Sequence, residues 1–146
     1  MIVLKVKVPD LNPFMFLKMY ATISLVNLGG MAMGLTVSAR VSNEDKATGA
    51  VPLMVLPQMS LAGAMIPYST MPKVGQILSN LAISRWGFEN LAIITQINPY
   101  LNATGLPNAY DDVFQGRQTV HFLVLIVFLF VLLAMAGLGI KRKDVR

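Results

Sequence analysis

The chain offers few side chains that could carry out chemistry. Its 146 residues include one histidine, His121, and no cysteine. Because no second histidine, thiolate or carboxylate cluster accompanies His121, the sequence predicts no metal site. Neither a G-x-S-x-G nucleophile motif nor a G-x-x-x-x-G-K-[ST] phosphate loop occurs. We therefore predict no catalytic residue, metal or cofactor in this chain, and we interpret His121 as a polar anchor at the mouth of an apolar segment.

Two charged side chains have a spacing that could serve a function. Arg85 and Glu89 are four residues apart, and on a helix such residues are neighbours that can form an ion pair. The surrounding segment carries an apolar stripe at helical spacing, made of Val74, Ile77, Leu78, Leu81, Phe88 and Leu91. We expect this stripe to bury against neighbouring helices. Two interpretations of the pair stay open: a solvated ion pair, or a gate in which Glu89 is shielded from water.

The elements that must position these residues are long and uncharged. Only 13% of the residues are charged, against about 25% in an average soluble domain. Uncharged runs of 21, 26 and 19 residues cover residues 19–39, 47–72 and 122–140, and a spanning helix needs about 20 predominantly apolar residues. The sequence therefore predicts an all-α membrane protein with three transmembrane helices, at about residues 19–39, 47–66 and 120–140.

The formal net charge of +5 does not indicate a nucleic-acid partner, because many of the basic residues stand at the ends of the apolar runs. The partner that this pattern predicts is the lipid bilayer. Basic residues crowd the turn at residues 40–46 and the tail at residues 141–146, and basic segments close to spans favour the cytoplasm. We therefore place the tail in the cytoplasm. Residues 67–118 and an N-terminal segment, residues 1–14, are expected outside.

Residues 67–118 form a long connection before the last span. Polar residues that include Asn80, Arg85 and Glu89 interrupt its apolar stripe, so we do not expect this segment to cross the membrane. A stripe of this length favours a re-entrant or interfacial helix. A long loop with a helix of its own is typical of a lid or vestibule, and Arg85 and Glu89 are its candidate outer gate.

The first two predicted spans carry polar side chains that lipid cannot satisfy. Ser24, Asn27 and Thr36 lie in the first span, and Gln58 lies in the second. Polar atoms at membrane depth need protein partners or a water-filled path. We predict that these four side chains face other helices and line a pathway.

The first span admits a second interpretation. Val37-Ser38-Ala39 has the small-residue pattern of a signal-peptide cleavage site, and lysines precede the apolar run. The run is longer than the apolar core of such a signal, which is usually about 7–15 residues, so a retained span is favoured. Within it, Gly30 and Gly34 form a G-x-x-x-G motif, which we interpret as a helix-packing contact.

Three stretches of the chain together resemble one family. They are the run Val51-Pro-Leu-Met-Val-Leu-Pro-Gln-Met-Ser-Leu-Ala-Gly-Ala-Met-Ile-Pro67, the dipeptide Met71-Pro72, and the run Ser84-Arg-Trp-Gly-Phe-Glu-Asn-Leu91. Their order, followed by a last span and a basic tail, is similar to the closing half of a type-2 ABC exporter permease. The chain most resembles the G-subfamily, in particular the bacterial proteins that carry a fused ATPase and a forkhead-associated domain.

This resemblance covers residues 15–146 and implies a function for them. In that family a proline-bearing fifth helix, a re-entrant external segment and a final helix follow one another. A complete permease has six helices per half, so the chain would correspond to the last three, a partial transmembrane domain. The implied partners are the missing N-terminal permease helices, an ABC ATPase that would hold ATP and magnesium, and a second permease half in a dimer. The implied location is the cell membrane, with a bacterial inner membrane the best match.

The sequence thus predicts the permease portion of an ATP-driven exporter, which forms part of the substrate pathway and an outer gate. One rival from another class stays open: a small accessory membrane protein that binds partner helices and transports nothing. Co-purification of an ATPase subunit would distinguish the two. An intramembrane enzyme is disfavoured, because the polar constellation that it needs is absent from the sequence.

Overall fold

The computed structural model describes residues 12–41, 43–99, 114 and 116–144. The regular elements reported for these residues are all helices, which confirms the predicted all-α class. In chain order they are α1 (Pro13–Arg40), α2 (Glu44–Ser60), the 3₁₀ turn η1 (Tyr68–Thr70), α3 (Lys73–Asn80), α4 (Ile83–Ile94) and α6 (Gln118–Asp144). Within the described part of the chain, α1 and α6 are the two helices long and apolar enough to cross a membrane.

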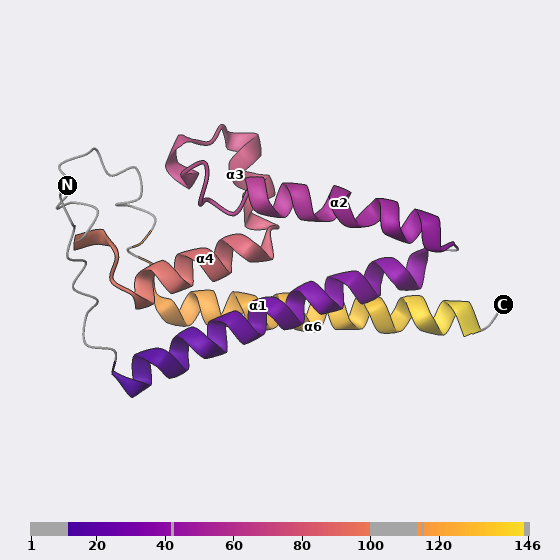
Figure 1. Ribbon diagram of the computed structural model, residues 1–146, viewed down its shortest axis with the longest axis horizontal. Helices are drawn as coiled ribbons and strands as arrows, with labels where there is room; N and C mark the ends of the chain where they lie inside the picture. The colour runs from indigo at the N-terminus through magenta and orange to yellow at the C-terminus, as the bar shows by residue number, and fades with distance from the viewer. Residues whose placement is uncertain (1–11, 42, 100–113, 115, 145–146) are drawn as a thin grey trace, which may run out of the picture.

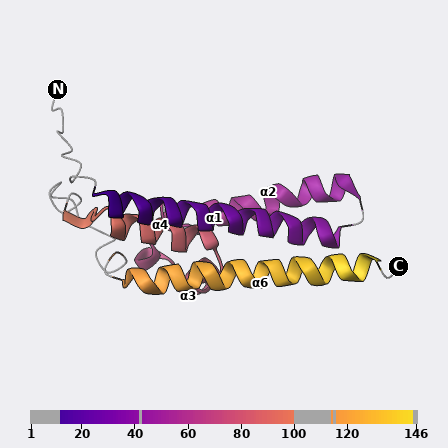
Figure 2. The same ribbon diagram turned by 90° about the horizontal axis from the view of Figure 1, so that it is seen from below.

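Helices α1 and α6 form the long axis of the molecule and lie side by side (Figures 1 and 2). At the end where both helices begin, Lys18 Nζ donates a hydrogen bond of 3.0 Å to Gln118 Oε1. At the other end, a Cβ placed on Gly139 would lie 2.9 Å from the Ala39 Cβ. With 28 and 27 residues, each helix is about 40 Å long, which exceeds the roughly 30 Å of a bilayer's hydrocarbon core.

Helix α2 runs back from the turn after α1 and diverges from it (Figure 1). Its 17 residues correspond to about 26 Å of helix, and they include Pro52 and Pro57. Residues 61–66, which the sequence analysis placed in the second span, are turns and bends. The prediction was wrong for these residues, because each proline removes a helical hydrogen bond and Gly63 adopts a positive φ of 84°, which regular helix does not accommodate.

Helix α4 lies against both α1 and α6, beside the first half of α1 (Figure 1). Two glycines allow this close approach. A Cβ on Gly29 would lie 2.1 Å from Ile83 Cδ1, and a Cβ on Gly87 would lie 2.4 Å from Val26 Cγ2. Helix α4 therefore begins beside the middle of α1 and runs back toward the end where α1 begins, so that it shares the depth of the two long helices.

The G-x-x-x-G motif does not make the predicted contact. A Cβ placed on Gly30 or Gly34 would have no atom of the described residues within 4 Å. The glycine that packs against another helix is the preceding residue, Gly29. The prediction was wrong in register, because the spacing of small residues does not show which face of a helix is covered.

The apolar stripe of residues 74–91 is divided between two helices. Its exposed members lie on α3 and directly after it: Val74, Ile77, Leu78 and Leu81. Leu81 is 64% exposed, whereas Phe88 on α4 is half-buried and its ring centroid lies 5.9 Å from that of Phe114. The expected burial is therefore wrong for α3, because the helix ends at Asn80 and the chain turns before α4. Helix α3 leaves an apolar face open.

Candidate functional site

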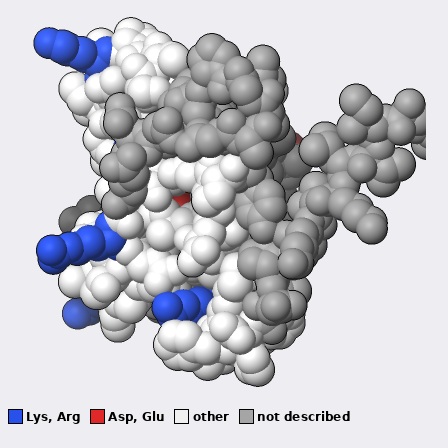
Figure 3. Space-filling view, turned by 90° about the vertical axis from the view of Figure 1, so that its left-hand side faces the viewer, with Lys and Arg blue, Asp and Glu red and all other residues white. Residues whose placement is uncertain are grey.

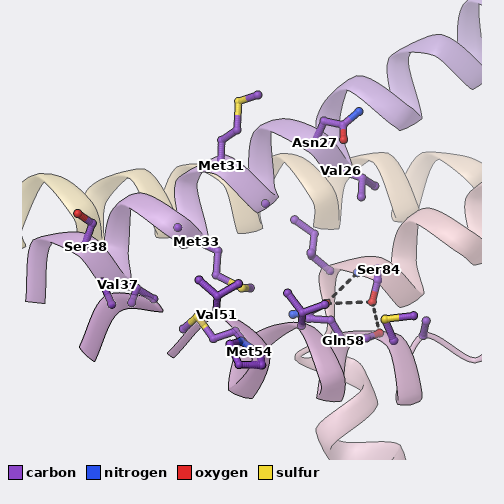
Figure 4. A pocket seen from close by; sticks show the side chains of 18 of the residues that line it. Val26, Asn27, Met31, Met33, Val37, Ser38, Val51, Met54, Gln58 and Ser84 are labelled. Atoms are coloured by element: carbon purple, nitrogen blue, oxygen red, sulfur yellow. Dashed lines mark hydrogen bonds between the residues drawn. The ribbon is translucent and has the colours of Figure 1, made fainter. Parts of the chain in front are cut away.

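A groove of about 1130 Å³ lies between α1 and α2 and is bordered by the start of α4 (Figure 4). We refer to it as the α1–α2 groove. Its lining is apolar and rich in methionine: Met31, Met33, Met54, Met59 and Met65. Methionine side chains are unbranched and adapt to apolar surfaces of different shape. The groove is therefore suited to bind apolar groups between the two helices.

Two of the four predicted pathway residues, Asn27 and Gln58, line the α1–α2 groove (Figure 4). Gln58 Oε1 accepts a hydrogen bond of 3.2 Å from the Ser84 backbone N–H. The Ser84 hydroxyl lies within hydrogen-bonding distance of the Gln58 carbonyl oxygen, at 2.6 Å, and of Gln58 Oε1, at 2.9 Å. These bonds connect the C-terminal part of α2 to the start of α4.

The other two predicted pathway residues do not line this groove. Thr36 is buried, and its hydroxyl lies 2.8 Å from the Ala32 carbonyl oxygen and 3.1 Å from the Leu132 carbonyl oxygen. Thr36 therefore faces α6, on which Leu132 lies. Ser24 is half-buried and is not part of the lining. Polarity within a span predicts a need for partners, but it does not show on which side of the helix those partners lie.

The candidate gate residues form a buried ion pair on α4. Arg85 Nε lies 2.6 Å from Glu89 Oε1, and the two residues are 6% and 3% exposed. A solvated surface pair does not fit this burial. Buried charges need complete hydrogen bonding to offset the loss of water, so the surroundings of the pair decide whether it is stable.

The second oxygen of Glu89 faces the last long helix. His121 Nε2, on α6, lies 3.2 Å from Glu89 Oε2. The other ring nitrogen, Nδ1, lies 3.1 Å from the Arg117 carbonyl oxygen. His121 is only 5% exposed, so its interpretation as an interfacial anchor is wrong. It is a buried contact between α6 and α4.

The charge of Arg85 has three further neighbours. Its Nη1 donates a hydrogen bond to Asn80 Oδ1. The guanidinium carbon lies 3.8 Å from the centroid of the Tyr68 ring and 5.1 Å from that of Trp86. A guanidinium above an aromatic face is attracted by the ring quadrupole. These contacts compensate the charge of the buried cation.

A neutral hydrogen bond extends the buried polar network to α1. Asn90, which is fully buried, donates from Nδ2 to Thr22 Oγ1 at 2.9 Å. The Thr22 hydroxyl in turn donates to the Lys18 carbonyl oxygen at 2.8 Å. Asn90 Oδ1 has no hydrogen-bond partner among the described residues. Adjacent residues of α4, Glu89 and Asn90, thus reach two different neighbouring helices.

Sequence reasoning missed His121, Asn90 and Thr22 as members of this network. A signal was present in the adjacent pair Glu89-Asn90, because two consecutive polar residues on a helix point about 100° apart and need two separate partners. A lone histidine at the start of a long apolar helix was the available partner for the acidic residue.

The arrangement can join helices. Within the described ranges, no group of three or more His, Cys, Asp or Glu side chains could hold a metal ion. Figure 3 shows the end of the molecule where α1 and α6 begin. On the described part of this surface, Lys and Arg side chains stand apart from one another among uncharged residues. The features that could serve a function are the α1–α2 groove, which can hold apolar groups, and the hydrogen bonds that connect the groove to α4.

Two helices long and apolar enough to cross a membrane, with a shorter helix packed against both through buried polar contacts, indicate an α-helical membrane protein. Comparison with protein families then gives a more specific result. Residues 2–95, more than half of the chain, match the family described as ABC-2 type transporter, and the chain belongs to this family. Comparisons with curated proteins and with solved structures found no match. The family supports a permease role in an ABC transporter, that of a membrane component which is not itself catalytic.

Proposed function

We propose that this chain is the C-terminal half of the permease domain of an ATP-driven exporter of the G-subfamily kind. The family match carries the permease role. The observation that carries the finer proposal is the position of α4, which comes after α2 and α3 in the chain and lies against both α1 and α6 with its charges buried. A helix that enters to mid-depth and returns supports the order of fifth helix, re-entrant segment and final helix to which the sequence is similar.

Three membrane crossings follow from this proposal. Helices α1 and α6 are each long and apolar enough to cross by themselves. Helix α2, at about 26 Å, is short for a crossing, and residues 61–72 complete its path beside α4. The turn between α1 and α2 and the end of α6 lie at one end of the molecule (Figure 1), and we place this end in the cytoplasm because of its basic residues. Residues 67–118 then lie on the outside.

The α1–α2 groove is the part of the substrate pathway that this chain contributes. Asn27 and Gln58 provide polar groups on its otherwise apolar lining. The hydrogen bonds between Gln58 and Ser84 connect the groove to α4. A change in the packing of α4 would therefore move Gln58 and alter the lining of the pathway. An outer gate requires such a coupling between its own position and the pathway.

The energy source lies in a partner. An ABC ATPase, with ATP and magnesium, is the proposed partner, together with the N-terminal permease helices and a second permease half. The apolar faces that α2 and α3 leave exposed are surfaces for these helices and for lipid. A bacterial inner membrane is the proposed location.

Cysteine labelling in intact cells tests the topology. The chain has no cysteine of its own, so Ser69→Cys and Val145→Cys each introduce a single thiol. We expect a membrane-impermeant maleimide to label Ser69→Cys in intact cells, and Val145→Cys only after the cells are opened. Labelling of both variants from the same face would exclude the three-crossing arrangement.

The gate is tested by Glu89→Gln in the complete transporter. The substitution removes the negative charge and keeps the shape of the side chain. We expect lower export at an unchanged amount of folded protein in the membrane, because the ion pair can no longer form and break. Export at the wild-type level would remove Glu89 from the gate.

A further inference from the structure

The two ring nitrogens of His121 both face hydrogen-bond acceptors. Nδ1 lies 3.1 Å from the Arg117 carbonyl oxygen, and Nε2 lies 3.2 Å from Glu89 Oε2. A carbonyl oxygen can only accept, so Nδ1 must carry a proton. A neutral imidazole has one N–H, which leaves Nε2 with a bare lone pair directed at a carboxylate oxygen. Without a further proton, this contact would set two lone pairs against each other.

We propose that Glu89 and His121 form a proton-binding site in which one additional proton, held between Glu89 Oε2 and His121 Nε2, joins α4 to α6. The proton can reside on the ring, which gives an imidazolium and a carboxylate. It can equally reside on the carboxyl group, which then donates to Nε2. Both arrangements supply a proton to each of the two ring contacts, whereas a neutral ring beside an ionised Glu89 has one N–H and leaves one of the two contacts without a proton. The site stands on this geometry and does not depend on the proposed exporter function.

The surroundings accommodate the additional positive charge. Arg85 already balances a Glu89 carboxylate, so the protonated site carries a net charge of one. Asn80 Oδ1 accepts from the guanidinium, and the Tyr68 ring lies against it. On the side of α1, Lys18 is engaged by Gln118 at the start of α6. The contribution from Arg117 is its carbonyl oxygen, a negative dipole end directed at Nδ1.

The burial of both partners makes the proton a structural element. Glu89 is 3% and His121 is 5% exposed, so water does not replace the contact readily. Separated glutamate and histidine side chains hold no such additional proton near pH 7.5. The folded chain therefore binds one proton more than the unfolded chain at this pH, and its stability should fall as the pH rises. The pair acts as a latch that a proton closes.

The chain's composition allows a direct test. His121 is the only histidine, and the sequence has two glutamates, Glu44 and Glu89. Ring-labelled histidine and carboxyl-labelled glutamate in the full chain, in detergent micelles at about pH 7.5, therefore give few and assignable NMR signals. We expect one of two states: both ring nitrogens protonated beside an ionised Glu89, or a neutral ring with Nδ1–H beside a protonated Glu89.

Two other states would overturn the proposal. In one, Nε2 carries the only ring proton and Nδ1 is bare. In the other, Nδ1 carries the only ring proton while Glu89 is ionised. So would a third, an imidazolium beside a protonated Glu89, because the pair would then hold two additional protons. Together with the two expected states, these cover the combinations open to a pair whose ring keeps at least one proton, so each outcome decides for or against a single shared proton.

Glu89→Gln is the matched variant, because it retains the hydrogen bonds and removes the titration. Its amide oxygen can accept from Arg85, and its N–H can donate to a neutral His121 Nε2. We expect His121 in this variant to be the neutral Nδ1–H form at the pH of the wild-type measurement. We also expect the melting temperature to be flat over the pH range in which that of the wild type falls. The same pH dependence in both proteins would overturn the latch.

A built-in fluorescent reporter gives a second reading. Trp86 is the only tryptophan, and its ring centroid lies 5.4 Å from that of His121. An imidazolium quenches indole fluorescence more strongly than a neutral imidazole does. If the NMR signals show an imidazolium, Trp86 emission should rise with pH in the wild type and stay constant in Glu89→Gln. An equal rise in both would contradict the assignment of the proton to this pair.

Discussion

Replacing Gly87 with alanine tests the contact that brings α4 against α1. A Cβ on Gly87 would lie 2.4 Å from Val26 Cγ2, whereas carbon atoms in good contact are about 3.5–4.0 Å apart. One of the two helices must therefore move by more than 1 Å, or Val26 must change rotamer. A β-branched side chain in a helix has one strongly preferred rotamer, so the second route is restricted.

The expected loss is that of an overpacked core, about 1–3 kcal/mol in the free energy of unfolding. Gly30→Ala is the control, because a Cβ there would have no described atom within 4 Å. Alanine is also the better helix former, so the control should be neutral or stabilising by up to about 1 kcal/mol. Val26→Ala in the Gly87→Ala background deletes the obstructing methyl groups and should restore most of the loss.

Unfolding of the purified chain in mixed micelles, followed by circular dichroism, measures these three variants and the single variant Val26→Ala. The double-mutant cycle then isolates the coupling between positions 26 and 87. We expect a coupling energy of about 0.5–3 kcal/mol. Equal stability of Gly87→Ala and Gly30→Ala would refute the close approach of α4 to α1. Failure of Val26→Ala to restore stability would assign the loss to another contact.

Two further substitutions probe the polar contacts. Glu89→Ala leaves Arg85 buried without its countercharge and should lower the free energy of unfolding by about 3–5 kcal/mol, so that little folded protein is recovered from the membrane. A Glu89→Ala protein as stable as wild type would show that the pair is hydrated. Ser84→Ala removes the hydroxyl contacts to Gln58 and should cost about 1–2 kcal/mol, with faster proteolysis between α2 and α3. Unchanged stability and proteolysis would show that these bonds do not hold α2 to α4.

The long helices were accessible to sequence reasoning because their signal is a sum over many residues. Roughly 20 uncharged residues in a row predict a span almost regardless of their order, and α1 and α6 follow that signal. Helix α2 was predicted too long, because hydropathy does not register the left-handed backbone at Gly63 or the two prolines before it. The apolar sequence continues over residues 61–66, where the structure has turns and bends.

The contacts of the site could be predicted only in part. Which side chains meet between two helices depends on how each helix is rotated about its axis, and the sequence does not give that rotation. Spacing alone paired Arg85 with Glu89, and the structure places them 2.6 Å apart. Nothing local connects Glu89 to His121, which lies 32 residues further along the chain. Thr36 was expected to line the pathway, yet it faces α6. One residue of register likewise separates the glycine of the predicted motif from Gly29, which makes the contact.

The central claim is that this chain is the membrane part of a transporter that an ABC ATPase domain or subunit drives. The most direct measurement is ATP hydrolysis by the chain purified from its own membranes in a mild detergent, compared with the chain purified alone after expression in a foreign host. The account predicts that the first preparation contains a second component with a G-x-x-x-x-G-K-[ST] loop and hydrolyses ATP in a vanadate-sensitive manner. It predicts that the chain alone hydrolyses none, because it lacks this loop. Hydrolysis by the chain alone, or a native preparation that contains no ATPase, would contradict the account.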